Sequence, residues 1–203
     1  VALPGRQFQR VGAGWRERMV CAAIGTLSFG LCHPADHPDL QTRLSDTRPG
    51  DIVEICPAAG PIAAVLAMRI AAHGGAALIV DYGDWHSLGD TLQAVRAHAP
   101  ADLLTQPGQA DLTAHVDFEA LARAAKTTAP TLQISPMTPQ GVFLERLGIT
   151  TRAQALAGRL SGAALTDLVG AHRRLTHADE MGTVFKVLGV APSAAATIAG
   201  LSV

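Results

Sequence analysis

This chain of 203 residues has few aromatic residues and almost no net charge. Phe, Trp and Tyr together make up 4% of the sequence, so a core must be built mainly from Ala, Leu, Val and Ile. The formal net charge is −1, which gives no basic surface for nucleic acid or for an anionic membrane. We therefore expect neither of these as a partner.

Cysteine is also rare. Cys21, Cys32 and Cys56 are an odd and widely spaced set without a CxxC pair. Such a set predicts neither a disulfide framework nor a cysteine zinc site. We expect buried free thiols in a reducing compartment, because free cysteine is one of the most frequently buried residue types.

Long apolar runs are absent as well. The uncharged apolar stretch from Cys56 to Met68 contains two prolines and a glycine and stops at Arg69. It falls well short of the roughly 20 residues that a membrane helix needs. The chain opens on Val1 without a basic segment and an apolar segment behind it, so we expect no signal peptide and a cytoplasmic location.

Several common catalytic motifs do not occur. The sequence has no GxSxG elbow, no GxxxxGK[ST] phosphate loop and no HExxH helix. Its GxG, at Gly12-Ala13-Gly14, lacks a third glycine and separates two β-type runs. This pattern predicts a three-residue hairpin turn, not a cofactor loop.

The first part of the chain has the pattern of a small β element. Strands are predicted on both sides of the glycine turn, at residues 6–11 and 15–22, and a third at 27–32. Residues 33–50 contain three prolines and predict a loop. We place a β element and its loop at residues 1–57.

From residue 58 onward, helical and strand patterns alternate. The first predicted elements are a helix from Gly60-Pro61, a strand at 76–80 and helices from Asp90 and Asp117. A strand at 131–135 follows, then a helix opened by Thr138-Pro139, helices at 151–160 and 163–174, and a last strand at 183–190. This order predicts an α/β fold over residues 58–203 with a helical insertion at about 139–178.

Polar residues gather behind the strand at 76–80. Asp81 and Tyr82 follow it directly, and ligands of open α/β sheets bind beyond the carboxyl ends of strands. Further polar candidates come later in the chain: Asp90, Gln93, Asp111, His115, Asp117 and Gln140.

Each of these residues also has a structural interpretation. Asp90 and Asp117 are suited to helix N-caps, His115 to a hydrogen-bonded structural histidine, and Tyr82 to the edge of a core. Asp111, His115 and Asp117 lack the spacing of a metal site, so no metal is expected.

Several motifs in order resemble one family. DYG at 81–83, GDTLQAV at 89–95, DLTAHVDFEALARAA at 111–125, QGVFLERLGI at 140–149 and RRLTHADEMGTVFKVL at 173–188 are similar to the MidA-type class I methyltransferases. Together they extend over most of the chain. Pro139 departs from the family, which usually has Thr before Gln-Gly.

The resemblance implies a Rossmann-like fold that uses S-adenosylmethionine. It also implies a protein substrate, which in the mitochondrial eukaryotic relatives is an arginine of a respiratory complex I subunit. The family carries a glycine-rich cofactor loop, an acidic ribose ligand and an NEFFDALP-like strand end ahead of the segment seen here. Val1-Ala2-Leu3-Pro4 resembles the end of that element, so we expect the C-terminal half of a methyltransferase sheet without cofactor-binding residues.

The sequence agrees with two alternative functions. In the first, the chain is a protein arginine methyltransferase, with Asp81 and His115 as catalytic residues. Asp81, Asp111 and Asp117 are then candidate guanidinium partners, because a carboxylate binds a guanidinium through two hydrogen bonds. The other substrate contacts expected are Tyr82, Asp90, Gln93 and Gln140.

In the second function, the chain is an inactive, truncated remnant that acts as a binding or structural module. Without the first half of the sheet, an edge and an apolar face are expected to lie uncovered.

Overall fold

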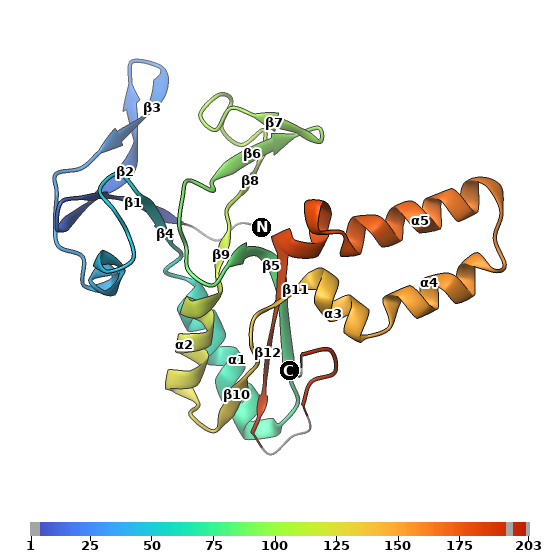
Figure 1. The fold of residues 1–203 in the computed structure, drawn as a ribbon. Helices are drawn as coiled ribbons and strands as arrows, with labels where there is room; N and C mark the ends of the chain where they lie inside the picture. The colour runs from blue at the N-terminus through green and yellow to red at the C-terminus, as the bar shows by residue number, and fades with distance from the viewer. Residues whose placement is uncertain (1–4, 194–196, 202–203) are drawn as a thin grey trace. The chain divides into compact units, whose positions relative to one another are not determined.

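A computed structural model describes residues 5–193 and 197–201 (Figure 1). Val1–Pro4, matched above to the end of a family element, lie outside the described residues. The chain divides into two compact units. One contains residues up to Ala59 together with His86–Asp117, and the other contains Gly60–Trp85 together with the chain from Phe118 onward.

The first unit begins with an antiparallel sheet of order β3-β2-β1-β4. Its strands are β1 (Arg6–Val11), β2 (Gly14–Ala23), β3 (Thr26–Leu31) and β4 (Ile52–Ile55). The three predicted strands are confirmed. The turn is shorter than predicted, because Val11 pairs with Gly14 and leaves Gly12-Ala13 as a two-residue loop. Gly12 has φ 61°, a left-handed conformation that glycine adopts without strain.

The core of this unit consists of Phe8, Trp15, Leu40 and Val53. Leu40 comes from the predicted loop, where two short 3₁₀ turns form, η1 (Pro38–Leu40) and η2 (Thr42–Leu44). The loop is therefore anchored by one fully buried apolar side chain.

A second, smaller sheet of this unit has the order β7-β6-β8. Its strands are β6 (Gln93–Arg96), β7 (Ala99–Ala101) and β8 (Asp111–Thr113), and the short β9 (Val116–Asp117) follows. The helix predicted from Asp90 is therefore wrong. Ala97 and His98 both have positive φ, 50° and 63°, and form the tight turn that reverses the chain between β6 and β7.

The second unit follows the predicted alternation of helices and strands. Its helices are α1 (Ala59–His73, starting at the unit boundary), α2 (Phe118–Thr128), α3 (Gln140–Arg146), α4 (Ile149–Ala157), α5 (Gly162–Thr176) and the π-helical turn η3 (Ala178–Gly182). Its strands are β5 (Ala77–Asp84), β10 (Leu132–Ile134), β11 (Thr138–Pro139) and β12 (Phe185–Pro192).

Strand β12 lies in the middle of this unit's sheet. It pairs antiparallel with β5 on one side and with β10 and β11 on the other, so β5 and β10 run in the same direction. Helices α1 and α2 cover one face, where Ala67, Ile70, Ala125, Leu132 and Val190 form the core together with Ala129 (Figure 1). The molecule is a mixed α/β fold, as predicted.

Two local predictions need correction. Thr138 and Pro139 pair with Val187 and Lys186 as β11, so Pro139 precedes helix α3 as its N-cap and is not its first residue. The cysteines are free, but Cys21 and Cys32 are exposed and only Cys56 is partly buried.

Among the described residues, no helix combines the length and the apolar character that crossing a membrane requires.

Candidate functional site

Two carboxylates share one amide in the first unit. Gln7 Nε2 donates to Glu54 Oε1 and to Asp90 Oδ1, each at 2.7 Å. Gln7 lies on β1 directly opposite Glu54 on β4, and both residues are 8% exposed. An amide nitrogen carries two hydrogens, so this one holds both carboxylates at once.

A guanidinium is bound beside this pair. Arg18 Nη1 donates to Asp90 Oδ2 at 2.5 Å and to Gln7 Oε1 at 3.1 Å. The guanidinium carbon also lies 3.8 Å from the centroid of the Phe29 ring, within cation–π range. A carboxylate, an amide oxygen and an aromatic face thus bind one arginine side chain.

Thr91 connects Glu54 to His115. Its backbone N–H donates to Glu54 Oε1 at 3.1 Å, and its hydroxyl donates to Glu54 Oε2. The same hydroxyl accepts a hydrogen bond from the backbone N–H of His115 at 2.9 Å. The buried carboxylate therefore has three donors, which offset the cost of removing it from water.

Ser87 links the network to Asp117. Its hydroxyl accepts from the Glu54 backbone N–H at 2.8 Å, and its own N–H donates to Asp117 Oδ2 at 3.1 Å. The structure thus brings together three of the residues named from the sequence, Asp90, His115 and Asp117. We call the set Gln7, Arg18, Glu54, Ser87, Asp90, Thr91, His115 and Asp117 the carboxylate network.

The remaining predicted residues lie elsewhere. Gln93 and Asp111 are exposed on the neighbouring strands β6 and β8. Asp81, Tyr82 and Gln140 belong to the second unit. Their participation in a site stays a prediction.

The three residues of the second unit all have local partners. Asp81 Oδ1 accepts from the Tyr82 backbone N–H at 2.8 Å, and the Tyr82 ring meets Phe185 edge-on, with centroids 5.4 Å apart. Gln140 is 7% exposed, and its amide donates to the Leu175 carbonyl at 3.0 Å, which ties α3 to α5.

Sequence reasoning missed Glu54, the most enclosed carboxylate of the network. A signal for it exists, because Glu54 is the one charged residue in the apolar run Ile52–Ile55. A charge at a buried strand position needs polar partners, which predicts a network around it.

Three carboxyl groups of the first unit have lowered pKa values. The hydrogen bond from Arg6 lowers the pKa of the Glu17 carboxyl, and that from Arg43 lowers the pKa of Asp46. At Asp102, hydrogen bonds from the backbone of Leu104 and from Thr105 lower the pKa. Each of these carboxylates is therefore held in its charged form by local donors.

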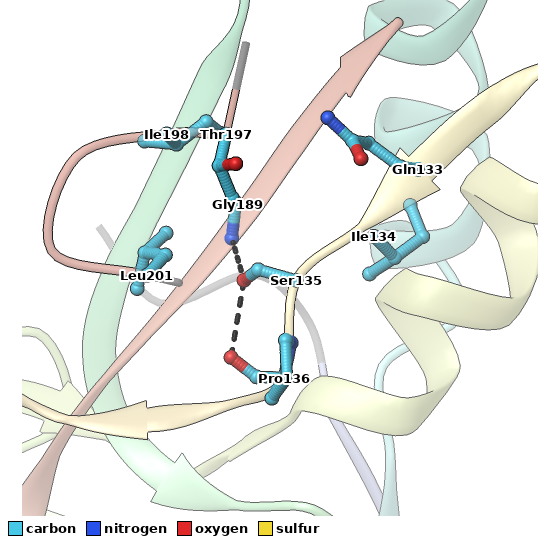
Figure 2. A pocket seen from close by; sticks show the side chains of 8 residues that line it. All are labelled: Gln133, Ile134, Ser135, Pro136, Gly189, Thr197, Ile198 and Leu201. Atoms are coloured by element: carbon cyan, nitrogen blue, oxygen red, sulfur yellow. Dashed lines mark hydrogen bonds between the residues drawn. The ribbon is translucent and has the colours of Figure 1, made fainter. Parts of the chain in front are cut away.

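Each unit has a hollow whose lining bears on the binding of a nucleoside cofactor. One of about 290 Å³ lies in the second unit between β10, β12 and the chain near Leu201 (Figure 2). There Ser135 Oγ accepts from the Gly189 N–H at 2.8 Å and donates to the Pro136 carbonyl at 3.0 Å. The hollow is lined by Gln133, Ile134, Ser135, Pro136, Gly189, Thr197, Ile198 and Leu201, without a carboxylate for ribose hydroxyls.

The other hollow, of about 410 Å³, lies beside the β6–β7 hairpin of the first unit. It includes Arg96 and Asp102 but no helix N-terminus. A nucleoside cofactor typically needs an acidic ribose ligand together with a glycine-rich turn into a helix. Neither hollow has both an acidic residue for the ribose and a glycine-rich turn into a helix, so neither hollow fits S-adenosylmethionine. Among the described residues, no group of three or more His, Cys, Asp and Glu side chains is placed to hold a metal ion.

Residues 2–135 match a family profile described as "Putative S-adenosyl-L-methionine-dependent methyltransferase". The chain is also similar to the mitochondrial protein arginine methyltransferase NDUFAF7 of Xenopus tropicalis, at 39% identity over 94% of this chain and 44% of the relative. The human protein of the same name is 35% identical over 94% of this chain and 43% of its own length.

Solved structures from Burkholderia thailandensis have the same fold. One, bound to S-adenosyl-homocysteine, superposes with a TM-score of 0.79 at 25% identity, and the match covers 98% of this chain and 53% of that one. A native structure superposes with a TM-score of 0.79 at 26% identity, and the match covers 98% of this chain and 55% of that one.

The chain thus spans less than half the length of the curated relatives and about half of the solved ones. The profile covers well over half of the present chain, and the frog and human relatives match nearly all of it. The chain therefore belongs to this family of S-adenosyl-L-methionine-dependent methyltransferases.

Proposed function

We propose that this chain carries the acceptor-binding side of an enzyme that methylates arginine in a protein substrate. The observation that carries the proposal is the guanidinium of Arg18 bound to Asp90, whose side chain is still 41% exposed. The name of the frog relative, a protein arginine methyltransferase, supports the same acceptor chemistry.

Asp90 is the residue through which we expect the acceptor to bind. A carboxylate has about four acceptor positions, and the Asp90 carboxylate uses one for Gln7 and one for Arg18. The remaining positions are available to a second guanidinium. Glu54 is a positioning residue, because it holds the Gln7 amide that in turn orients Asp90.

The other residues predicted from the sequence are assigned to proton transfer and to alignment of the substrate. Methylation of a guanidinium nitrogen releases a proton, and Asp81 and His115 are the proposed acceptors for it. The reaction depends mainly on alignment of the nucleophilic nitrogen. The proposed contacts for that alignment are Tyr82, Gln93, Asp111, Asp117 and Gln140.

The cofactor of the proposed enzyme is S-adenosylmethionine, the cofactor named in the description of the family. We assign its binding to the part of the relatives' fold that this chain does not cover. In this interpretation, the strand order β10-β12-β5 is one end of a Rossmann-like class I sheet, and β5 is its fifth strand.

The proposed protein substrate is a subunit of respiratory complex I or its bacterial counterpart. The exposed free thiols of Cys21 and Cys32 favour a reducing compartment such as the cytoplasm, where thiols stay reduced.

Calorimetric titration with synthetic peptides tests the acceptor. An arginine peptide is expected to bind the chain, and the same peptide with lysine in its place is expected to bind at least about tenfold more weakly, because lysine cannot form the bidentate pair. Asp90→Asn should abolish the preference, whereas Asp36→Asn, at an exposed carboxylate, should keep it. Equal binding of the two peptides would refute the proposed acceptor.

The second candidate function is a catalytically inactive binding or structural module. The misfit of both hollows to the cofactor favours it. A folded chain that binds arginine peptides but supports no methyl transfer, even together with the uncovered part of a relative, would establish this function in place of the first.

A further inference from the structure

The four-stranded sheet of the first unit has its core on one face. Phe8 and Val53 are opposite each other on β1 and β4 and belong to that core. Successive side chains of a strand point to opposite faces, so their neighbours Gln7 and Glu54 point the other way. The register extends this second face into a row with one side chain from each strand: Leu31, Arg18, Gln7 and Glu54. We call the face with this row the outer face.

The outer face is enclosed at β4 and open at β3. Gln7 and Glu54 are each 8% exposed, whereas Leu31 at the other end of the row is 39% exposed. Val20 on β2 and Leu27 on β3 share the outer face by alternation and are 53% and 37% exposed. The Phe29 ring lies between them, because Phe29 pairs with Val20. We call the apolar side chains of this face the hairpin patch: Val20, Leu27, Phe29 and Leu31.

A carboxylate adjoins the hairpin patch. The Arg18 guanidinium contacts both Asp90 and the Phe29 ring, so the carboxylate and the patch are continuous. The Asp90 side chain is 41% exposed and attracts a cation, while exposed apolar side chains gathered on one face attract apolar ones. A polypeptide segment that carries an arginine and apolar residues complements both.

We propose that the hairpin patch binds an extended segment of the protein substrate and selects apolar residues at fixed positions relative to the acceptor arginine. This binding rests on the proposed function, in which that arginine binds Asp90. Along β2, Arg18, Val20 and Ala22 point to the outer face at intervals of about 7 Å, the spacing of alternate residues in an extended chain. With its arginine beside Arg18, the segment places its residues two and four positions away over Val20 and Leu27, at the next two paired levels of the hairpin.

Two peptides of identical composition test this spacing. Each has a central arginine with valines and serines alternating on both sides of it. In the first peptide the valines are two and four positions from the arginine, and in the second they are one and three positions away. Calorimetric titration of the whole chain should show at least about fivefold tighter binding of the first, because only its valines leave water on the patch.

Val20→Thr with Leu27→Thr should abolish the difference between the peptides, because threonine suits a strand and removes apolar surface. The matched control is Met19→Thr with Cys21→Thr, two exposed positions on the opposite face of β2, and it should keep the difference. Circular dichroism of each variant verifies that it is folded. A difference that survives in the patch variant, or that is lost in the control, would overturn the proposal.

Two further results bear on the occupant. Replacement of the arginine by lysine in the first peptide separates this proposal from the acceptor: equal binding of arginine and lysine refutes the acceptor and the spacing together. A preference for arginine with equal binding of the two valine patterns refutes the spacing alone. A dimer of this chain that the patch variant dissociates would also overturn the proposal, because a second copy would then be the occupant.

Discussion

At the scale of single residues, the carboxylate network is the part of the molecule with the most demanding chemistry. Glu54 is buried, and its oxygens receive donors from Gln7 and Thr91, which are distant from it in the sequence. Loss of one donor leaves a buried acceptor unsatisfied, which costs more than an average hydrogen bond contributes.

The Thr91 hydroxyl is the most informative position for a stability test. Thr91→Val removes the donor to Glu54 Oε2 and the acceptor of the His115 N–H while keeping the size of the side chain. We expect a loss of about 1–3 kcal/mol in the free energy of unfolding, measured with urea. Thr127→Val, at an exposed position of α2, should change it by less than about 0.5 kcal/mol. Similar values for both variants would show that the hydroxyl is not part of a network.

The pair Arg6–Glu17 predicts a dependence of stability on pH. Its two hydrogen bonds, of 2.7 and 2.8 Å, connect β1 to β2 and hold the pKa of Glu17 below its ordinary value of 4.5. A carboxyl with a lowered pKa in the folded state stabilises the protein above its unfolded pKa, and this contribution is lost as the pH falls through the folded pKa.

Glu17→Gln tests this contribution. At pH 7 the variant should be less stable by about 0.2–1 kcal/mol, because Arg6 is largely exposed and water screens the pair. The difference should shrink to near zero at a pH below the folded pKa of Glu17. Asp167→Asn, at an exposed carboxylate of α5, provides the comparison, and a difference that persists in acid would contradict the ion-pair explanation.

At the scale of elements, the helical insertion depends on two glycines that allow close backbone contacts. A Cβ added to Gly141 in α3 would lie 2.4 Å from the Thr176 carbonyl oxygen at the end of α5, and one added to Gly182 would lie 2.1 Å from it. Real Cβ atoms do not approach an oxygen so closely, so the helices would have to move apart.

Gly141→Ala is therefore expected to lower the melting temperature by several degrees, equivalent to about 1–3 kcal/mol. Gly170→Ala makes the same change within α5, where a Cβ would meet nothing within 4 Å. It should raise stability by up to about 1 kcal/mol, because alanine favours the helix. A neutral result for Gly141→Ala would show that α3 and α5 do not pack as described.

Local patterns allowed most elements to be predicted from the sequence, because helices such as α2 and strands such as β12 have clear periodicity and clear end signals. The β6–β7 hairpin was missed, because its turn is Ala97-His98 and lacks the Asn-Gly or Asp-Gly residues that usually mark such turns. The network was only partly predictable. Gln7 and Asp90 are 83 positions apart, and no local pattern encodes a contact at that distance.

At the scale of the whole molecule, the chain matches 53–55% of the length of the solved relatives at a TM-score of 0.79. In the second unit, α1 and β5 leave large apolar side chains exposed, among them Val65 and Leu78. Neither of the two hollows fits the family's cofactor, while the first unit binds the guanidinium of its own Arg18. We infer that acceptor binding belongs to this chain and cofactor binding to the part of the relatives' fold that the chain does not cover.

Transfer of a labelled methyl group from S-adenosylmethionine to the arginine peptide tests this division most directly. The chain, the uncovered part of the frog relative and an equimolar mixture of the two are measured side by side. We predict transfer by the mixture alone, and a reduction of at least about tenfold when the mixture contains Asp90→Asn, because the guanidinium is then no longer held by a charged partner. Transfer by this chain without the added segment, or undiminished transfer with Asp90→Asn, would contradict the division.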